Sequence, residues 1–544
     1  MTRTTSFLAV TALLLSIAAS AQRLHSPWDA ASITPTNTPY TCPAPPAFSK
    51  TLTADGYYTD KQYSVIDPKK LAAFNQATAG PTQLGQDATR AADQYRTSGS
   101  RAAAACVYSL LSAAAAADAW DGDMPQNNGT YLQNWLLSAA GIAYLKVRNS
   151  EAGTQQQEAA ILEWFRRLAK PEHDYFEAHT ARAGSDAWNN HLYWAGLALA
   201  AEGIASNDPD ALLWGIATNR LGVDAVQPDG SLPAEMARGQ MALHYQLYAL
   251  GALIMIAELG EANGIAMYSQ RDGAIHRLVR FDTAALEDPG IITKRTGLTQ
   301  NIAKTYSGLE IGWAVPYVRR FPDPQLSALI AQSSWTNFWQ WGGAPPGIEN
   351  ALAASTTAEI SQRLTHQLAE AFPSPSLSSP FLGAWCVQGD PSAHASIHIE
   401  HDALLLAGQS GDTSLAETPK PTMLLAPGWL GVEGNLSPDH SQIDWTNGTY
   451  WMRCAAPLDK LPNLSGEWIA MGLISKPASI QMSGKTLQLD NEEGATATGQ
   501  IDANSHIDSN WSGKRITGQV TGDGNHINWD NQTYWTRAKV YRKK

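Results

Sequence analysis

The sequence is poor in several features that mark common classes of protein. Charged residues make up only 16% of its 544 residues, and a net charge of −12 leaves no excess of cations for a polyanion such as nucleic acid. After the N-terminal leader, no apolar run reaches the about 20 residues that cross a bilayer, and residues 249–259 are too few. We therefore expect no nucleic-acid partner and no membrane-bound product.

Catalytic motifs with fixed spacing are also missing. The chain has no G-x-S-x-G, no H-E-x-x-H, no Walker loop and no C-x-x-C. Their absence argues against the common hydrolase and nucleotide-binding classes. We expect no cofactor and no metal.

Cysteine is scarce, with four residues in the whole chain: Cys42, Cys106, Cys386 and Cys454. The N-terminus combines a basic residue, an apolar run and a small-residue cleavage site, which predicts a signal peptide over residues 1–21 and a mature chain starting at Gln22. A periplasmic or secreted protein meets an oxidising compartment, where four cysteines suit two disulfides, one in each half of the chain. Three pairings are formally possible.

What the chain has in abundance is helical patterning over its first two thirds. Stretches such as "YLQNWLLSAAGIAYLKVRN" and "QQQEAAILEWFRRLAK" repeat apolar residues at three- and four-residue spacing. Short loops with Pro, Gly, Asn or Asp separate them, which favours successive antiparallel pairs over a β-α-β alternation. We expect an all-α domain of stacked helical hairpins over residues 22–372.

A change of composition follows this domain. Residues 373–382 form a Pro/Ser-rich linker, and short alternating stretches typical of antiparallel strands come after it. "IDWTNGTYWMR" at Ile443 is repeated 84 residues later as "INWDNQTYWTR" at Ile527. We therefore expect an all-β, internally duplicated antiparallel domain, with repeats at 383–462 and 463–544.

The duplication also bears on the cysteines. Cys386 follows the first tryptophan of repeat one and Cys454 ends its last strand, whereas repeat two has no cysteine at either place. A disulfide that closes repeat one is the simplest interpretation, and it leaves Cys42 for Cys106.

Two side-chain groups in the β repeats could bind a ligand. The repeated hairpins carry aromatic residues that suit either sugar stacking or, slightly better, two small β cores: Trp445, Tyr450, Trp451, Trp529, Tyr534 and Trp535. His394, His398 and Glu400 could share one strand face and hold a metal, but repeat two has Gln481 and Ser483 in place of the last two. A solvated strand face is the better interpretation.

Polar side chains gather in two stretches of the helical half. In "WNNHLYW", residues 188–194, Asn190 is placed to cap a helix that begins near His191. In "PAEMARGQMALHYQLY", Arg238 and Tyr245 are seven residues apart, which is nearly the same face after two helical turns. Taken singly, the first pattern also fits a structural histidine, and the second fits an arginine whose aliphatic part packs on a core tyrosine while its guanidinium reaches solvent.

Together the two stretches resemble the alginate lyases of polysaccharide lyase family 5, the poly(β-D-mannuronate) lyases. The resemblance spans residues 40–372 and includes "CPAPP" at Cys42 and "AAACVYSLLSAAAAAD" around Cys106. It implies an incomplete (α/α) toroid around a groove, a disulfide between these two cysteines, and an acidic polysaccharide as substrate. It also implies a set of catalytic residues: Asn190, His191, Arg238 and Tyr245.

The chemistry of the implied reaction explains these residue types. β-Elimination removes the C5 proton of a uronate beside its carboxylate and then protonates the O4 leaving group. Asn190, His191 and Arg238 can neutralise the carboxylate and stabilise the enolate-like transition state, a role worth about 3–4 kcal/mol per donor. We expect Arg238 to lower the pKa of Tyr245, so that the phenol acts as base and then as acid when proton and O4 share a face, as in mannuronate. In guluronate they lie on opposite faces, and His191 would be the base.

The segment that covers the groove departs from the family pattern. The family has a "SKYEGSD" type of lid, whereas this chain has "DKQYSVID", with Lys61 and Tyr63 separated by Gln62. We still expect Lys61 and Tyr63 to cover the groove and bind substrate. Trp188 and Tyr248 are further candidates for stacking on sugar rings, although core packing suits each of them equally.

The leading hypothesis is thus an exported, monomeric lyase that acts on alginate or polymannuronate. Three alternatives remain: a lyase for another glucuronate-bearing exopolysaccharide, a glycoside hydrolase, and a non-catalytic polysaccharide-binding protein. A hydrolase would need two carboxylates across the groove, and Asp229 and Glu235 are the nearest candidates.

Overall fold

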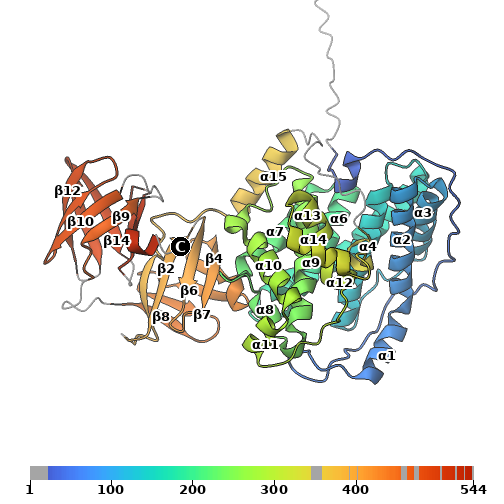
Figure 1. Cartoon of the computed structure of the whole chain (residues 1–544), viewed down its shortest axis with the longest axis horizontal. Coiled ribbons are helices and arrows are strands. Elements are labelled where there is room, and N and C mark those ends of the chain that lie inside the picture. The colour runs from blue at the N-terminus through green and yellow to red at the C-terminus, as the bar shows by residue number, and fades with distance from the viewer. Residues whose placement is uncertain are drawn as a thin grey trace, which may run out of the picture.

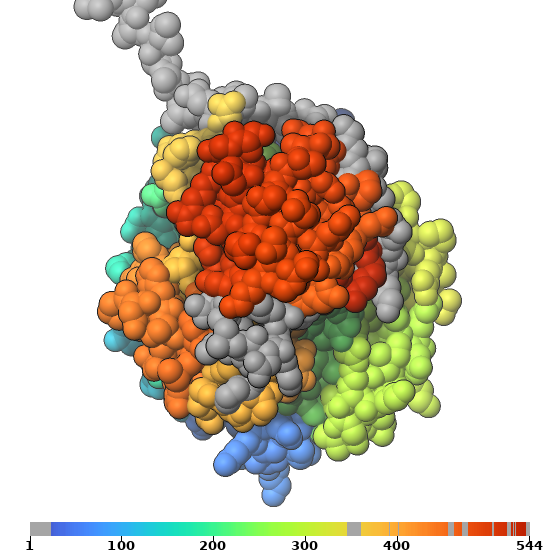
Figure 2. Space-filling model, turned by 90° about the vertical axis from the view of Figure 1, so that its left-hand side faces the viewer, coloured from blue at the N-terminus to red at the C-terminus, as the bar shows by residue number. Residues whose placement is uncertain are grey.

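A computed structural model describes residues 23–344, 358–390, 392–400, 402–454, 462–470, 477–502, 505–520, 524–531 and 533–541. The predicted signal peptide and Gln22 lie outside these residues. The molecule consists of a helical domain followed by two β-barrels, arranged in a row (Figure 1). Seen from the barrel end, the C-terminal barrel stands in front of the first barrel and the helices (Figure 2).

Fifteen α-helices of the described residues precede the barrels. They are α1 (Pro68–Ala77), α2 (Ala79–Ser98), α3 (Arg101–Ala116), α4 (Asn127–Val147), α5 (Gln155–Thr180), α6 (Asn190–Ser206), α7 (Pro209–Ala225), α8 (Pro233–Met236), α9 (Ala242–Glu261), α10 (Gln270–Glu287), α11 (Gly290–Thr296), α12 (Gly308–Ile311), α13 (Ala314–Arg320), α14 (Pro324–Gln332) and α15 (Ala358–Ala371). Side chains cap several of them, as at α7, where Asp208 accepts from two backbone N–H groups and Pro209 takes the first helical position.

The long helices form two layers that alternate along the chain. Helices α2, α4, α6 and α9 pack side by side as an inner layer, and α3, α5, α7 and α10 cover them from outside. Helices α4, α6 and α9 are buried almost along their whole length, which explains why they are apolar on every side. This alternation is the (α/α) toroid expected from the sequence.

Helix α9 illustrates how burial accounts for an apolar sequence. The segment Gly239–Glu261 is long and apolar enough to cross a bilayer, yet 94% of its most apolar window is buried inside the helical domain. It is the one such helix among the described residues. Its hydrophobicity is that of a core helix.

The segment before α1 is tied to the helices by the first disulfide. Cys42 and Cys106 are bonded, with their Cα atoms 5.4 Å apart, so this pairing is confirmed. Cys106 lies on α3, and the chain beyond Cys42 runs across to bring residues 56–63 over the N-terminal ends of the inner helices.

Each β repeat closes into an eight-stranded antiparallel barrel. Barrel 1 comprises β1 (Gly383–Val387), β2 (His394–Glu400), β3 (Ala403–Ala407), β4 (Thr413–Lys420), β5 (Met423–Ala426), β6 (Val432–Leu436), β7 (Gln442–Trp445) and β8 (Tyr450–Arg453). Barrel 2 comprises β9 (Gly466–Ala470), β10 (Pro477–Ser483), β11 (Thr486–Asp490), β12 (Thr496–Ile501), β13 (His506–Trp511), β14 (Lys514–Val520), β15 (His526–Trp529) and β16 (Tyr534–Arg537), followed by the short α16 (Ala538–Tyr541). Neighbouring strands pair in chain order and the first strand of each barrel pairs with the last, so the predicted duplication is confirmed.

The repeated aromatic residues fill the barrels. Trp445, Trp451, Trp529 and Trp535 are between 2% and 5% exposed, so they do not form a sugar-stacking platform. Tyr450 is the exposed member at 37%, and Tyr534 is half-buried. The alternation of strand side chains turns every second aromatic residue inwards, which is why core packing is the correct interpretation.

Barrel 1 contains the second disulfide and the histidines of β2. Cys386 and Cys454 are bonded, as predicted. On β2, His398 Nε2 lies 3.7 Å from Glu400 Oε2, whereas His394 lies beside the disulfide, so the three residues do not converge on one point. Phe381, from the end of the predicted linker, already belongs to the barrel core.

Barrel 1 is fixed to the helical domain by buried ion pairs. Arg271 of α10 contacts Asp224 of α7 and reaches across to Glu417 and Asp402 of the barrel. Arg220 of α7 adds a second bond to Glu417, with Nε 3.3 Å from Oε1. Charges buried at such an interface need fixed partners on both sides, so they hold the barrel in one orientation.

Candidate active site

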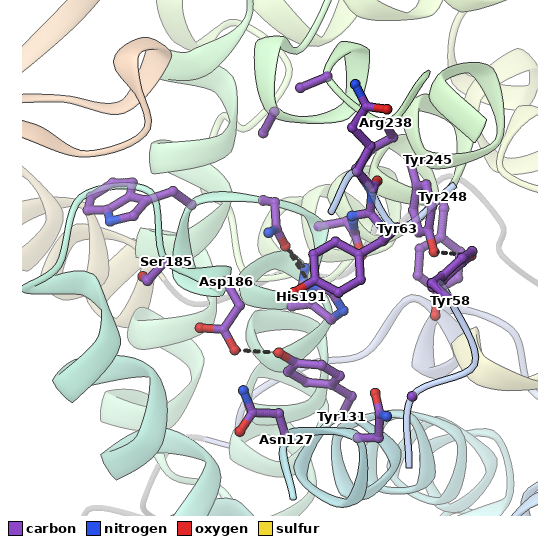
Figure 3. A pocket seen from close by; sticks show the side chains of 18 of the residues that line it. Tyr58, Tyr63, Asn127, Tyr131, Ser185, Asp186, His191, Arg238, Tyr245 and Tyr248 are labelled. Atoms are coloured by element: carbon purple, nitrogen blue, oxygen red, sulfur yellow. Dashed lines mark hydrogen bonds between the residues drawn. The ribbon is translucent and has the colours of Figure 1, made fainter. Parts of the chain in front are cut away.

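A cleft of about 1050 Å³ opens at the N-terminal ends of the inner helices (Figure 3). The first turns of α4, α6 and α9 all contribute side chains to its wall. Each helix N-terminus carries a partial positive charge and unpaired backbone N–H groups. Three such ends at one cleft favour an anionic ligand.

His191 lies at the start of α6 in a fixed tautomer. Asn189 Oδ1 accepts a hydrogen bond from the backbone N–H of His191 at 3.0 Å and lies 2.6 Å from His191 Nδ1. Because the atom that faces the backbone N–H must be an acceptor, Nδ1 must carry the ring proton. Burial, helped by the nearby Arg238, lowers the pKa of His191 to about 3, so the imidazole is neutral with a free lone pair on Nε2.

The cap of α6 is therefore Asn189, and the expectation that Asn190 caps it is wrong. Asn190 is the first helical residue and is fully buried. Its backbone N–H donates to Glu235 Oε1 at 2.7 Å, and its Nδ2 lies 3.0–3.1 Å from both carboxylate oxygens of Glu235. The amide hydrogens that were expected to face a uronate thus face Glu235. Asn190 Oδ1 has no hydrogen-bond partner among the described residues.

Arg238 and Tyr245 meet as the seven-residue spacing predicted, although Arg238 precedes the helix. The chain between them passes through the short 3-10 helix η3 (Gly239–Met241) before α9 begins. The Arg238 guanidinium carbon lies 3.6 Å from the centre of the Tyr245 ring, and Nε donates to the carbonyl of Gln62 at 3.1 Å. No carboxylate of the described residues forms an ion pair with this largely buried cation, which leaves its two Nη groups available to an anion.

The expected lowering of the Tyr245 pKa is wrong for the free protein. Burial raises the pKa of Tyr245, and the favourable field of Arg238 only partly offsets that effect. The phenol is therefore protonated at neutral pH, and its oxygen lies 2.6 Å from that of Tyr58. A buried phenol can give a proton, whereas it accepts one poorly.

An aspartate at the other side of the cleft supports His191 indirectly. Asp186 accepts hydrogen bonds from the phenols of Tyr131 and Tyr175, and its Oδ1 lies 2.6 Å from His179 Nδ1. Burial alone would raise the pKa of Asp186, but these hydrogen bonds outweigh it and lower the pKa. The Tyr131 ring in turn packs on the ring of His191, with centroids 3.9 Å apart.

The predicted covering segment lies where it was expected. Lys61 and Tyr63 both line the cleft and both are exposed. Gln62, the residue that interrupts the family pattern, supplies the carbonyl that Arg238 binds. Their contact with sugar stays a prediction.

The two proposed stacking residues are almost fully buried in the wall of the cleft. Trp188 is 5% exposed and donates from Nε1 to the carbonyl of Arg182 at 3.1 Å. Tyr248 is 6% exposed, packs on Trp194 and accepts from Gln340 Nε2 at 2.9 Å. Both line the cleft as largely buried side chains, so core packing accounts for each of them, and their stacking on sugar rings stays a prediction.

The carboxylate pair of a hydrolase is not assembled here. Glu235 is fully buried, and both of its oxygens bind Asn190. Asp229 binds Ser231 and Arg295 and does not line the cleft. The two do not face each other across a groove, as an inverting or retaining glycosidase requires.

Sequence reasoning missed four residues of the site. Asn189 could have been found, because it directly precedes the first residue of the helical pattern and Asn is a favoured cap. Asp186 and Tyr131 gave no signal, since 55 residues separate them and only the packing of α4 beside the α5–α6 connection brings them together. Leu430 comes from barrel 1 and could not have been assigned to a cleft in another domain.

Comparisons with known proteins agree with this geometry. The alginate lyase family profile matches residues 51–292. A polysaccharide lyase of Stenotrophomonas maltophilia strain K279a is 40% identical over 285 residues, which cover 52% of this chain and 82% of that protein. An alginate lyase of Pseudomonas syringae pv. syringae strain B728a is 31% identical over 263 residues, which cover 48% of this chain and 68% of that protein.

Among solved structures, a variant of alginate lyase A1-III from Sphingomonas species A1, complexed with a tetrasaccharide, superposes with a TM-score of 0.51 and 21% identity. The match covers 60% of this chain and 90% of that one, and at this identity it supports the fold alone. The family profile ends before the barrels begin. By the identity and coverage of its relatives, the chain belongs to the alginate lyase family.

Proposed function

We propose that this protein is a polysaccharide lyase that cleaves alginate-type uronate polymers by β-elimination, with polymannuronate as the preferred test substrate. One observation carries the proposal: a neutral imidazole, a protonated phenol and a cation without an ion-pair partner among the described residues line one cleft. The relatives named as alginate lyases support the choice of polymer.

The uronate carboxylate binds next to Arg238. The free Nη groups of this residue offer paired donors to a carboxylate, and the N-termini of α4, α6 and α9 add favourable potential. Neutralising the carboxylate is the first requirement of the reaction, because removal of the C5 proton places a second negative charge beside it. Asn190, Arg238 and Tyr245 are largely buried, and an ion pair is stronger in such a low-dielectric environment than in water.

Two residues share the proton transfers. His191 Nε2 takes the proton from C5, the electrons of that bond form the C4–C5 double bond, the C4–O4 bond breaks, and Tyr245 gives its proton to O4. The protonation states of the free protein support this assignment, because His191 has the lone pair and Tyr245 has the proton. It replaces the scheme in which Tyr245 performs both transfers. Because the C5 proton and O4 of mannuronate lie on one face of the sugar, it requires His191 Nε2 and the Tyr245 hydroxyl, which both line the cleft, to reach that same face. Asn189 and Asp186 act as positioning residues for His191.

Two disulfides suit an oxidising compartment, so we place the enzyme in the periplasm or outside the cell. We further propose that it acts as a monomer.

Incubation with polymannuronate, polyguluronate, glucuronan and other acidic exopolysaccharides tests the proposal. The ultraviolet absorbance of unsaturated uronate reports elimination alone, and new reducing ends without it would mean hydrolysis. We expect Tyr245→Phe to lose at least about 100-fold in kcat/KM, in line with the loss of a general acid. Tyr450→Phe, an exposed tyrosine of barrel 1, is the matched control and should keep full activity. Binding without either product would indicate a non-catalytic polysaccharide-binding protein.

A further inference from the structure

One end of the cleft is built by a domain that the family profile does not cover. Leu430 of barrel 1 lines the cleft together with Gly184, Ser185 and Trp188 of the helical domain. In Figure 3 the pale orange ribbon of the barrel enters at the upper left, on the side of Ser185 and Asp186 and away from Tyr58 and Tyr245. A polymer that leaves the catalytic residues in this direction therefore approaches the barrel.

The barrel loop that carries Leu430, residues 427–431, is called the end loop here. It contains the short 3-10 helix η6 (Pro427–Trp429) and connects β5 to β6. Within the barrel, the backbone N–H of Gly428 donates to Ser414 Oγ at 3.0 Å, and the Trp429 ring packs against Trp445 and Trp451 with centroids 5.8 Å away. The end loop is thus anchored in the barrel core.

Contacts with the helical domain fix the end loop from the other side. The Gly184 N–H donates to the carbonyl of Leu430 at 2.7 Å. Gly431 has a φ of +74°, and a Cβ atom there would lie 1.9 Å from Trp188 Cε2, so the loop backbone lies directly on that indole. Leu430 itself has a φ of +56°, a left-handed conformation that a leucine keeps only where its surroundings impose it.

We propose that barrel 1 forms the end wall of the substrate cleft and that Leu430 limits how many uronate units bind on the side of Ser185 and Asp186. The inference rests on the proposed lyase function and refines its specificity. Because the end loop is anchored on both sides, the wall does not yield to a longer chain. The enzyme then releases short products whose length is set by the distance from the catalytic residues to the wall.

The test compares the full-length protein with Leu430→Gly and Leu430→Asn on polymannuronate. Glycine and asparagine both accept a left-handed backbone, so each variant removes the apolar side chain and keeps the loop conformation. Met452→Ala, which shortens an exposed side chain of barrel 1, is the matched control. Mass spectrometry of early products should show short oligomers for the wild type and the control, and longer oligomers for both Leu430 variants. The ratio of kcat/KM on polymer to that on a short oligomer should rise by about tenfold in these variants.

Two outcomes separate the wall from the lyase function. If the wild type forms unsaturated uronate and the Leu430 variants release products of the same length as the wild type, the wall is refuted and the lyase function stands. If no uronate polymer yields unsaturated product, the proposed function fails. The wall is then tested by calorimetry with Tyr245→Phe and oligomannuronates of increasing length. In Tyr245→Phe, affinity should stop rising at a shorter oligomer length than in the double variant Tyr245→Phe/Leu430→Gly. A plateau at the same length in both variants would refute the wall.

Discussion

The pH dependence of kcat/KM distinguishes which residue removes the C5 proton. If His191 is the base, it must be neutral, and a pKa of about 3 keeps it neutral at every pH above that value. If Tyr245 is the base, the reaction needs its phenolate, which is scarce because burial raises the pKa of this residue. The two schemes differ most between pH 5 and 9.

The expected changes in kcat/KM follow from these protonation states. At pH 5 a histidine with a pKa of about 3 is about 99% neutral, whereas one with the ordinary value of about 6.5 is only about 3% neutral. With His191 as base, kcat/KM at pH 5 should stay within about twofold of its value at pH 7, instead of falling about 25-fold. With Tyr245 as base, kcat/KM should rise about tenfold for each pH unit between 6 and 8.

Initial rates from unsaturated-uronate absorbance, measured at low polymannuronate concentration from pH 5 to 9, provide the assay. Uronate carboxylates stay ionised over this range, and circular dichroism at each pH controls for unfolding. A decrease of kcat/KM with falling pH that is centred near pH 6.5 would show that His191 has an ordinary pKa and would refute the effect of burial on it. A steady tenfold rise per pH unit would refute its role as base and restore the single-tyrosine scheme.

Three further predictions concern the support of the site and the barrels. Glu235→Gln replaces one of the two acceptors opposite the Asn190 amide by a donor. We expect kcat/KM to fall roughly 100-fold in kinetic assays and the free energy of unfolding in urea to fall by about 1–3 kcal/mol. Wild-type values would show that Asn190 needs no such partner. Gly431→Ala forces a Cβ atom against Trp188, so we expect a lower midpoint of thermal unfolding and a loss of about 1–3 kcal/mol in the free energy of unfolding. An unchanged midpoint in calorimetry would mean that the end loop does not pack directly on the indole. Replacing both cysteines of the barrel 1 disulfide by serine removes a 68-residue loop closure and should cost this barrel about 4 kcal/mol, and calorimetry that shows no earlier transition would contradict this.

Much of the helical domain could be predicted because its cause is local. Apolar residues at three- and four-residue spacing mark α4 and α5 in the sequence itself, and both helices form as expected. The duplication was equally visible, since two copies of one pattern need no knowledge of contacts. What the sequence did not contain was the closure of each repeat into a barrel, which depends on pairing between the first strand and the last.

The site divides along the same line. The spacing of Arg238 and Tyr245 and the resemblance of two motifs selected the residues of the cleft. Their chemical states depended on burial and on neighbours that are distant in sequence. Glu235 accepts the hydrogen bonds of the Asn190 amide nitrogen, and burial outweighs Arg238 in the pKa of Tyr245. The sequence by itself thus determined which side chains are available, because helix formation and spacing are local. The tertiary structure decided their protonation, their orientation and the end loop that closes the cleft, since each of these depends on contacts between segments far apart in the chain.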